Sequence, residues 1–173
     1  QHLLEITNHH LDLIQFDRVD ETIPSHIVVN DNQDSAYKAV NHLIQMGYRK
    51  IALFGGSDQL TIYKDRKKGY LKAIKEAELS IPYNYILDNV LTTEKGMEVA
   101  SELLKSKEPP DAFFTVSDYS ALGVLRAASA LGLNVPEQVG IIGFSNETFT
   151  DLILPPLSSV DQKSRNLGKE ATN

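Results

Sequence analysis

Short apolar runs alternate along the chain with longer stretches in which apolar residues recur every three or four positions. A continuous apolar run such as Ile51 to Phe54 or Ala112 to Val116 is typical of a strand that is buried on both faces. The two earliest runs, which end at Phe16 and Val29 just before polar clusters, are also predicted to be buried. The predicted strands are Leu11 to Phe16, His26 to Val29, Ile51 to Phe54, Tyr85 to Leu87, Ala112 to Val116 and Val139 to Ile142.

A helical period follows most of these runs. Between Ala36 and Ile44 the apolar residues fall on one helix face, Asp31 is placed to cap the first turn, and Gly47 is placed to end the helix in a left-handed conformation. Ser117 is likewise placed to cap a helix. Further helices are predicted across Ile62 to Ala77, Met97 to Leu104, Ala121 to Ala128 and Lys163 to Thr172.

Strands that alternate with helices of about a dozen residues pair in parallel, because parallel neighbours need a crossover connection. These crossovers are right-handed almost without exception. We therefore predict an α/β fold with a doubly wound parallel sheet. In such a sheet, ligands bind beyond the carboxyl ends of the strands, where loops and helix N-termini converge.

Short polar side chains follow the successive predicted strands, so the topology places them on that one edge. The set comprises Asp17-Arg18, Ser57-Asp58, Asp88-Asn89, Ser117-Asp118 and Ser145-Asn146. Carboxylates and amides exchange hydrogen bonds with hydroxyl groups, and an arginine can fork across two oxygens, so the set suits a polyhydroxylated ligand. Asp, Asn and Ser also follow strands because they cap helices and start turns. The structural interpretation therefore stays open for each pair, most of all for Ser117-Asp118.

One arginine stands on a helix face that is predicted to be buried. Arg66 shares helical spacing with the apolar residues Ile62 and Tyr70. An arginine there requires an anionic or hydroxyl partner, which makes Arg66 a candidate ligand contact. The neighbouring lysines instead predict a solvated helix face: Lys64, Lys67 and Lys68.

Composition limits the function classes. The 173 residues suffice for one domain, or for one lobe with pieces of another, and no apolar run approaches the roughly 20 residues that span a bilayer. The formal charge of −6 argues against a DNA-binding surface, so any DNA contact is expected outside these residues. The chain has no cysteine, which fits a reducing cytoplasm. We interpret both ends of the sequence as cuts.

No catalytic or metal-binding motif is complete. The run Gly143 to Glu147 half resembles the Gly-x-Ser-x-Gly elbow of α/β hydrolases, but the last glycine is absent and no histidine follows Ser145. There is no glycine-rich nucleotide motif, and the adjacent pair His9-His10 is a poor metal site. We therefore expect a binding module with no enzyme activity, no cofactor and no metal.

Several short motifs occur along the chain from about Leu13 to the end. They are Phe16-Asp17-Arg18, Ala39 to Ile44, Gly47 to Ala52, Gly55-Gly56, Arg66 with Gly69-Tyr70, Pro110 to Phe113, Ser117-Asp118 with Ala121 to Gly123, Val135-Pro136, Gly143-Phe144 and Pro155 to Gln162. Each is weak alone, but in this order they are specific. On these motifs the chain resembles the effector-binding core of the lactose/galactose repressor (LacI/GalR) family, a periplasmic-binding-protein-like fold.

The resemblance implies two lobes with a ligand cleft between them, a homodimer, and an N-terminal helix-turn-helix headpiece that lies outside this chain. Residues 1–30 are expected to end the N-terminal lobe, residues 31–160 to form the C-terminal lobe, and residues 161–173 to return into the N-terminal lobe. We expect the chain to cross between lobes near residues 29–31 and near residues 160–162.

The family's site residues carry over one by one. Its cleft arginine matches Arg66, its strand-end aspartate matches Asp17, and its Ser/Asn-Asp pair matches Ser117-Asp118. The usual Gly-aromatic-Asp-Asp/Asn motif reads Gly143 to Asn146 here. Serine therefore replaces the first aspartate at position 145, and Asn146 is the residue left to take its role.

On this resemblance we expect a cytoplasmic sensor whose small effector, a sugar or a sugar-like molecule, alters the affinity of DNA-reading heads for an operator. The ligand-binding candidates are Asp17, Arg18, Ser57, Arg66, Ser117, Asp118, Ser145 and Asn146. Loss of Arg66 is expected to blunt the effector response without unfolding the lobe. The alternative is a periplasmic sugar-binding protein of a transport system, which shares the fold and the cleft; the segment Pro155 to Gln162 favours the regulator.

Overall fold

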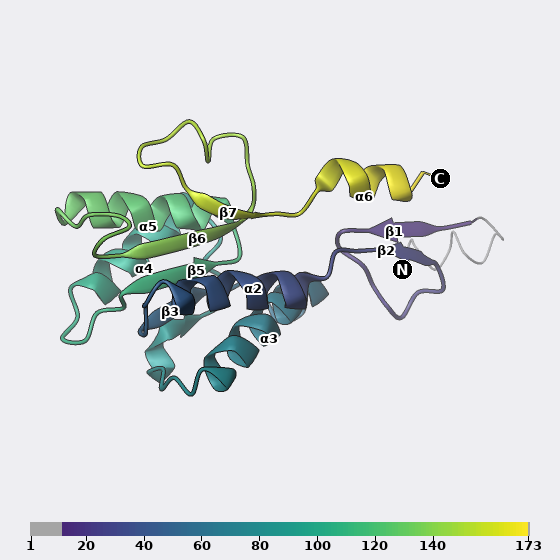
Figure 1. Cartoon of the computed structure of the whole chain (residues 1–173). Coiled ribbons are helices and arrows are strands. Elements are labelled where there is room, and N and C mark those ends of the chain that lie inside the picture. The colour runs from purple at the N-terminus through teal and green to yellow at the C-terminus, as the bar shows by residue number, and fades with distance from the viewer. Residues whose placement is uncertain (1–11, 173) are drawn as a thin grey trace.

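The computed structural model describes residues 12–172 and contains two separate parallel sheets (Figure 1). A two-stranded ribbon is formed by β1 (Ile14–Phe16) and β2 (His26–Val28). The main sheet has five strands in the order β4-β3-β5-β6-β7, and all its neighbours pair in parallel. Its strands are β3 (Ile51–Phe54), β4 (Ile86–Leu87), β5 (Ala112–Thr115), β6 (Gly140–Ser145) and β7 (Ser158–Asp161).

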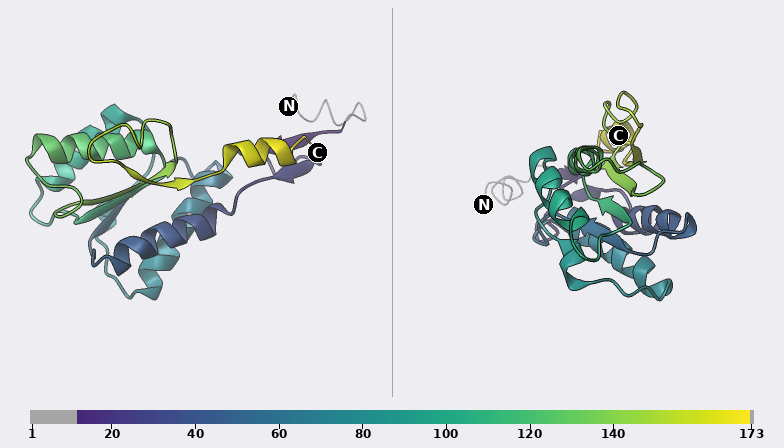
Figure 2. Two further views of the ribbon diagram at one scale, coloured as in Figure 1. Left: turned by 45° about the horizontal axis from the view of Figure 1, so that its top comes forward. Right: turned by 90° about the vertical axis from the view of Figure 1, so that its left-hand side faces the viewer.

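Helices cover both faces of the main sheet (Figures 1 and 2). Alternate residues of each buried strand point to opposite faces, so Ile51 and Leu53 of β3 join one core while Ala52 and Phe54 join the other. The prediction of a doubly wound α/β fold is therefore confirmed. The first core lies under α2 (Asn32–Gln45) and α3 (Thr61–Glu76), and the second under α4 (Thr93–Leu104) and α5 (Asp118–Ala130).

The winding of the sheet reverses between two central strands. From β3 the chain moves outward to β4, and it then returns to β5 on the other side of β3. The loops that leave β3 and β5 therefore diverge at the carboxyl ends of these strands, which is the position at which open α/β sheets bind ligands. The candidate pairs Ser57-Asp58 and Ser117-Asp118 follow these two strands.

Two connections join the main sheet to the smaller part of the molecule. Residues 29–31 lead from β2 into α2, and residues 162–163 lead from β7 into α6 (Ser164–Glu170). We call these two connections the neck, and the part from α2 to β7 the main body. The ribbon and α6 lie together beyond the neck (Figures 1 and 2).

Several local predictions hold and others fail. Asp31 caps α2 by accepting a hydrogen bond from the Asp34 amide, and Gly47 after that helix has a φ of +101°. The prediction that the first two strands are buried was wrong: Ile14 and Phe16 are 43% and 54% exposed. Among the described residues the ribbon strands pair only with each other, so they lack the two covering layers that bury β3.

Several strand boundaries also differ from the prediction. Tyr85 belongs to a short 3-10 helix, Tyr83–Tyr85, and the strand begins after it. The last central strand continues to Ser145, three positions beyond the predicted end at Ile142, which places a candidate ligand residue within the strand. In the part of the chain from 12 to 172, no helix combines the length and apolar character needed to cross a membrane.

Candidate functional site at the strand ends and the neck

Arg66 occupies the centre of the candidate site. It lies in α3 between Ile62 and Tyr70 on the buried face, as predicted, and is only 3% exposed. Three separate segments accept hydrogen bonds from its guanidinium. Nε donates to Asn32 Oδ1 at 2.9 Å, Nη1 to the Val116 carbonyl at 2.9 Å, and Nη2 to Gln162 Oε1 at 3.1 Å.

These partners correct the prediction that Arg66 needs an anionic or hydroxyl partner. All three acceptors are neutral carbonyl or amide oxygens of the protein, and the guanidinium also stacks on Phe144, with 3.7 Å from Cζ to the ring centroid. Its planar fork matches three acceptors in different directions. Truncation of Arg66 is thus expected to lower the stability of the main body, a cost that the expectation of a blunted effector response without unfolding did not include.

Burial lowers the pKa of Arg66 to about 10, and the nearby charges of Asp17 and Asp118 partly oppose that shift. The side chain still carries its proton at pH 7, because three pH units below the pKa leave about one molecule in a thousand neutral. Asp17, Arg18 and Asp118 all lie close enough for their charges to act on Arg66. These three predicted site residues thus affect the pKa of Arg66 through their charges, while its hydrogen bonds go to Asn32, Val116 and Gln162.

Asp118 serves as a structural link between elements. Its side chain is fully buried; Oδ1 accepts from the Ser159 hydroxyl at 2.6 Å and Oδ2 from the Glu147 amide at 2.8 Å. These contacts tie the start of α5 to β7 and to the loop after β6. Ser117 stands at the N-cap position, but its side chain does not cap the helix; it donates to the Leu91 carbonyl at 3.2 Å instead. The capping role predicted for Ser117 was wrong.

Three candidate residues at strand ends have unusual backbone conformations. Asp17 has a φ of 63°, Ser145 of 129° and Asn146 of 56°. Residues other than glycine rarely adopt positive φ, and such strain gathers at binding sites and switch regions. Ser145 and Asn146 also line an open hollow of about 590 Å³ that reaches Lys163 and Arg165 at the start of α6. This volume lies within the range of small-molecule sites, about 300–1,000 Å³.

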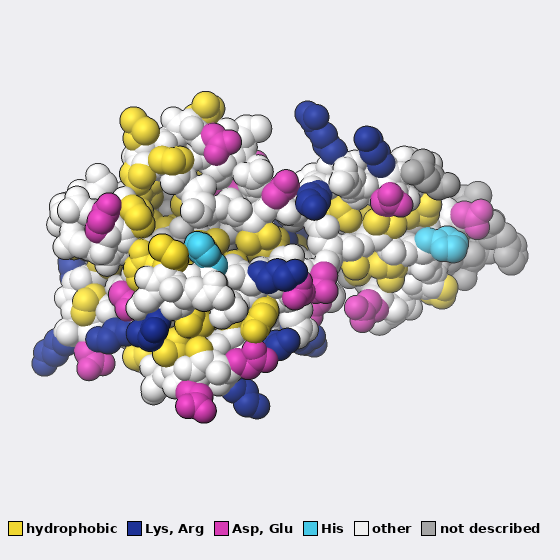
Figure 3. All heavy atoms as spheres, viewed as in Figure 1, with side chains coloured by type: hydrophobic (Ala, Val, Ile, Leu, Met, Phe, Trp, Pro, Cys, Tyr) yellow, Lys and Arg dark blue, Asp and Glu magenta, His cyan; other side chains and the backbone are white. Residues whose placement is uncertain are grey.

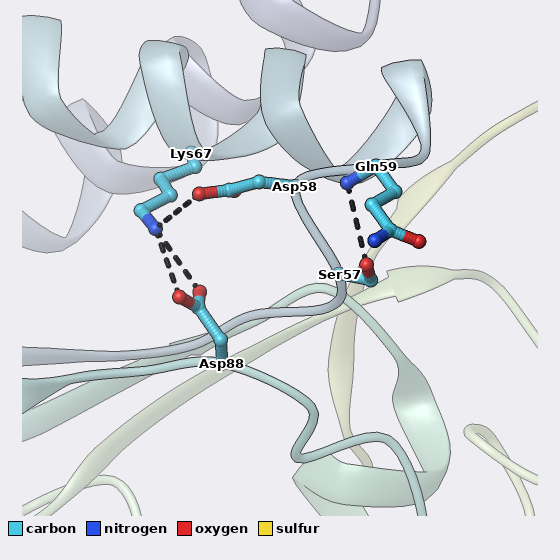
Figure 4. A network of polar contacts seen from close by, with 5 residues as sticks. All are labelled: Ser57, Asp58, Gln59, Lys67 and Asp88. Atoms are coloured by element: carbon cyan, nitrogen blue, oxygen red, sulfur yellow. Dashed lines mark hydrogen bonds and ion pairs between the residues drawn. The ribbon is translucent and has the colours of Figure 1, made fainter.

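A separate ion-pair network lies at the ends of β3 and β4 (Figure 4). The Lys67 ammonium group pairs with Asp58 and Asp88, each at 3.0 Å. Partial burial alone would lower the pKa of Lys67, but hydrogen bonds to these two carboxylates outweigh it and raise the pKa. Lys64 and Lys68 are exposed and Lys67 is partly exposed, in agreement with the solvated helix face predicted for the three lysines; the two carboxylate partners of Lys67 were not predicted. Ser57 turns away from the network and accepts from the Gln59 amide at 3.3 Å.

Sequence reasoning missed Asn32 and Gln162 as partners of Arg66. They lie 34 and 96 positions away from it, and neither stands in a local pattern that predicts contact with an arginine. In residues 12–172 no three side chains of the metal-binding types lie close enough together to hold an ion. The pair His9-His10 lies outside the described residues. After Ser145 the chain enters a loop that lacks the helix of a hydrolase elbow.

Comparison with known proteins places this architecture in a family. Residues 40–173 match the model of the periplasmic binding protein-like domain. A LacI-family regulatory protein from Chloroflexus aggregans superposes with a TM-score of 0.90 at 30% identity, over 96% of this chain and 60% of that one. The chain belongs to the LacI family. The resemblance drawn from the short motifs is thus confirmed.

Curated relatives in this LacI family are transcriptional repressors. The HTH-type repressor PurR of Haemophilus influenzae (strain PittEE) is 35% identical over 147 residues, which are 84% of this chain and 44% of PurR. The HTH-type repressor CytR of Escherichia coli K12 is 36% identical over 141 residues, 82% of this chain and 41% of CytR. The chain therefore spans less than half the length of these relatives. A CelR–cellobiose complex superposes with a TM-score of 0.86 at 27% identity, over 96% of this chain and 51% of that one.

Proposed function

We propose that this LacI-family chain senses a small effector at the carboxyl ends of β3, β5 and β6 and transmits its binding through the neck to a DNA-reading part of the regulator. The observation that carries the proposal is the placement of Arg66. It bonds to Val116 at the end of β5 and stacks on Phe144 of β6, and it also bonds to Gln162 in the neck. A ligand that moves the strand ends therefore acts on the neck through one side chain.

The proposed ligand is a sugar or a sugar-like molecule. The hollow beside Ser145 and Asn146 offers hydroxyl, amide and cationic groups, which suit neighbouring hydroxyls and anionic substituents. Cellobiose is bound in one structural neighbour, and an Escherichia coli neighbour was solved with phosphate. The proposed binding set remains Asp17, Arg18, Ser57, Arg66, Ser117, Asp118, Ser145 and Asn146, with Arg66 and Asp118 as the buried floor.

The proposed output is a change in operator affinity. An effector that binds one arrangement of the two lobes better than the other shifts the population toward it. A coupling of about 1–3 kcal/mol changes the affinity for DNA by roughly 5–150-fold. The proposal places the headpiece outside this chain, the regulator in the cytoplasm and the activity in binding without catalysis. The repressor names of the curated relatives support it.

We also propose that the regulator is a homodimer, as members of such a family are expected to be. The loop between β6 and β7 carries Leu152 and Leu154, which are 81% and 92% exposed, and hydrophobic side chains gather there (Figure 3). A second copy of the chain would cover this patch. Sedimentation of the intact protein should give a dimer that Leu154→Asp weakens, whereas Leu71→Asp on α3 should leave it unchanged.

A thermal-shift screen tests ligand binding directly. The panel contains cellobiose, other sugars, nucleosides and sugar phosphates, and a ligand at 100 times its dissociation constant should add about 2.7 kcal/mol of stability. Asn146→Gly removes the amide and keeps a residue that tolerates positive φ. Asn89→Gly is the matched control, because Asn89 has a φ of 61° at the end of the outermost strand β4. Loss of the shift in Asn146→Gly alone supports the site; equal shifts in both variants remove Asn146 from it.

The rival function is solute binding for transport, and operator DNA separates the two. A regulator's ligand must change the affinity of the intact protein for its operator, as measured by fluorescence anisotropy, whereas a transport protein gives no specific DNA binding. A ligand that binds tightly without altering DNA affinity would reject the regulator proposal.

A further inference from the structure

The two connections of the neck are joined to each other and to α3 by a closed ring of hydrogen bonds. Asn30 Nδ2 donates to the Gln162 carbonyl at 2.7 Å, and the side chain of Gln162 accepts from Arg66 at 3.1 Å. Arg66 in turn donates to Asn32, whose backbone amide donates to the Asn30 carbonyl at 2.8 Å. Four residues from three separate segments thus close one circuit, which we call the neck ring.

Gln162 has a special place in the neck ring because it uses both its backbone and its side chain. Its carbonyl holds the other connection through Asn30, while its side-chain oxygen holds the main body through Arg66. The bond from Arg66 is charge-assisted, which makes it stronger than a bond between neutral groups. A short connection between two bodies is where backbone rotation changes their relative angle. Bonds that bridge both connections therefore limit that rotation.

We infer that Gln162 is a positioning residue that sets the angle between the main body and the part carrying the ribbon and α6. The inference rests on the proposed function, since the angle between these two parts is what effector binding would change. Arg66 contacts the ends of β5 and β6 as well as Gln162, so displacement of these strand ends loosens or tightens the neck ring. Gln162 is thereby the residue through which occupancy of the site reaches α6.

The angle can be measured by pulsed electron–electron double resonance between two spin labels. The chain has no cysteine, so substitutions introduce the only labelling sites. Lys75→Cys on α3 and Lys169→Cys on α6 place exposed labels on the two sides of the neck. Gln162→Met removes the acceptor with little change of shape, whereas Gln162→Glu keeps an acceptor oxygen for Arg66. Gln45→Met, at an exposed position near the end of α2, is the matched control.

The neck ring predicts a broadened or shifted label–label distance distribution in Gln162→Met, and distributions like that of the unsubstituted chain in Gln162→Glu and Gln45→Met. Asn30→Ala breaks the ring at its other bond without removing a contact of Arg66, so it should broaden the distribution as well. Thermal unfolding of Gln162→Met and Asn30→Ala checks that both remain folded. A Gln162→Met or Asn30→Ala distribution that matches Gln45→Met overturns the inference. No effector or DNA is used, so the outcome is independent of the ligand screen.

Discussion

Gly69 determines how closely α2 and α3 approach, and replacing it tests the packing beneath the candidate site. A Cβ added at Gly69 would lie 2.2 Å from the Gln33 carbonyl oxygen and 2.8 Å from Ala36 Cβ, whereas ordinary contacts begin near 3.4 Å. The two helices would have to separate by roughly 1 Å, and the obstacle is backbone, which cannot rotate away. The same approach holds Asn32 at the start of α2 within hydrogen-bonding distance of Arg66.

The expected cost follows from two opposing effects. Overpacking costs about 1–3 kcal/mol, and the better helix propensity of alanine returns up to about 1 kcal/mol. We expect Gly69→Ala to lower the free energy of unfolding by about 1 kcal/mol. Gly168→Ala is the control, because no atom of residues 12–172 lies within 4 Å of a Cβ at that helical position, and it should be neutral or stabilising by up to about 1 kcal/mol. Urea unfolding followed by circular dichroism measures both. Equal stability of the two variants would refute the close-packing argument.

Two further predictions concern the buried arginine and the ion-pair network. Arg66→Met leaves three acceptors without their donor, which costs about 1–3 kcal/mol for each buried group, and this cost is partly offset by removal of a buried charge. We expect the free energy of unfolding, measured in urea, to fall by about 1–3 kcal/mol relative to Arg126→Met at an exposed position. Equal stability of the two variants would contradict this prediction. The raised pKa of Lys67 means that its ion pairs stabilise the fold below the ordinary lysine pKa of 10.5 and lose that effect as pH rises through the raised value. Lys67→Met should therefore cost about 0.5–1 kcal/mol at pH 8 and less once the pH exceeds the raised pKa of Lys67, whereas Lys64→Met should show no such trend; a cost that does not change with pH would count against the ion pairs.

The sequence predicted most of the main body because its strands and helices have strong local signals. The run Ile51 to Phe54 is buried on both sides, and its continuous apolar character is what two covering layers require. The first two strands have the same character, yet they are exposed, because burial depends on which elements cover a strand. No local pattern distinguishes Phe16 in the ribbon from Phe54 in the sheet.

The candidate site was predictable only in part, for a similar reason. Helical spacing placed Arg66 on a buried face, but its partners come from segments 34, 50 and 96 positions away. Gln162 stands in a motif of the family resemblance, without any sign that it bonds to an arginine. The predicted capping role of Ser117 was wrong because its hydroxyl donates to the Leu91 carbonyl of a neighbouring loop. For both Arg66 and Ser117, residues distant in the sequence determine the hydrogen bonds that the side chain makes.

Binding of a small effector at the strand ends is most directly tested by amide NMR spectra of the isotopically labelled chain, recorded with each ligand of the panel and with cellobiose first. The account predicts that a bound ligand shifts the amide signals at residues 17–18, 117–118 and 145–146 and those of the neck. Shifts confined to the opposite end of the sheet, around residues 129–135, or no shift with any sugar, nucleoside or sugar phosphate, would contradict it.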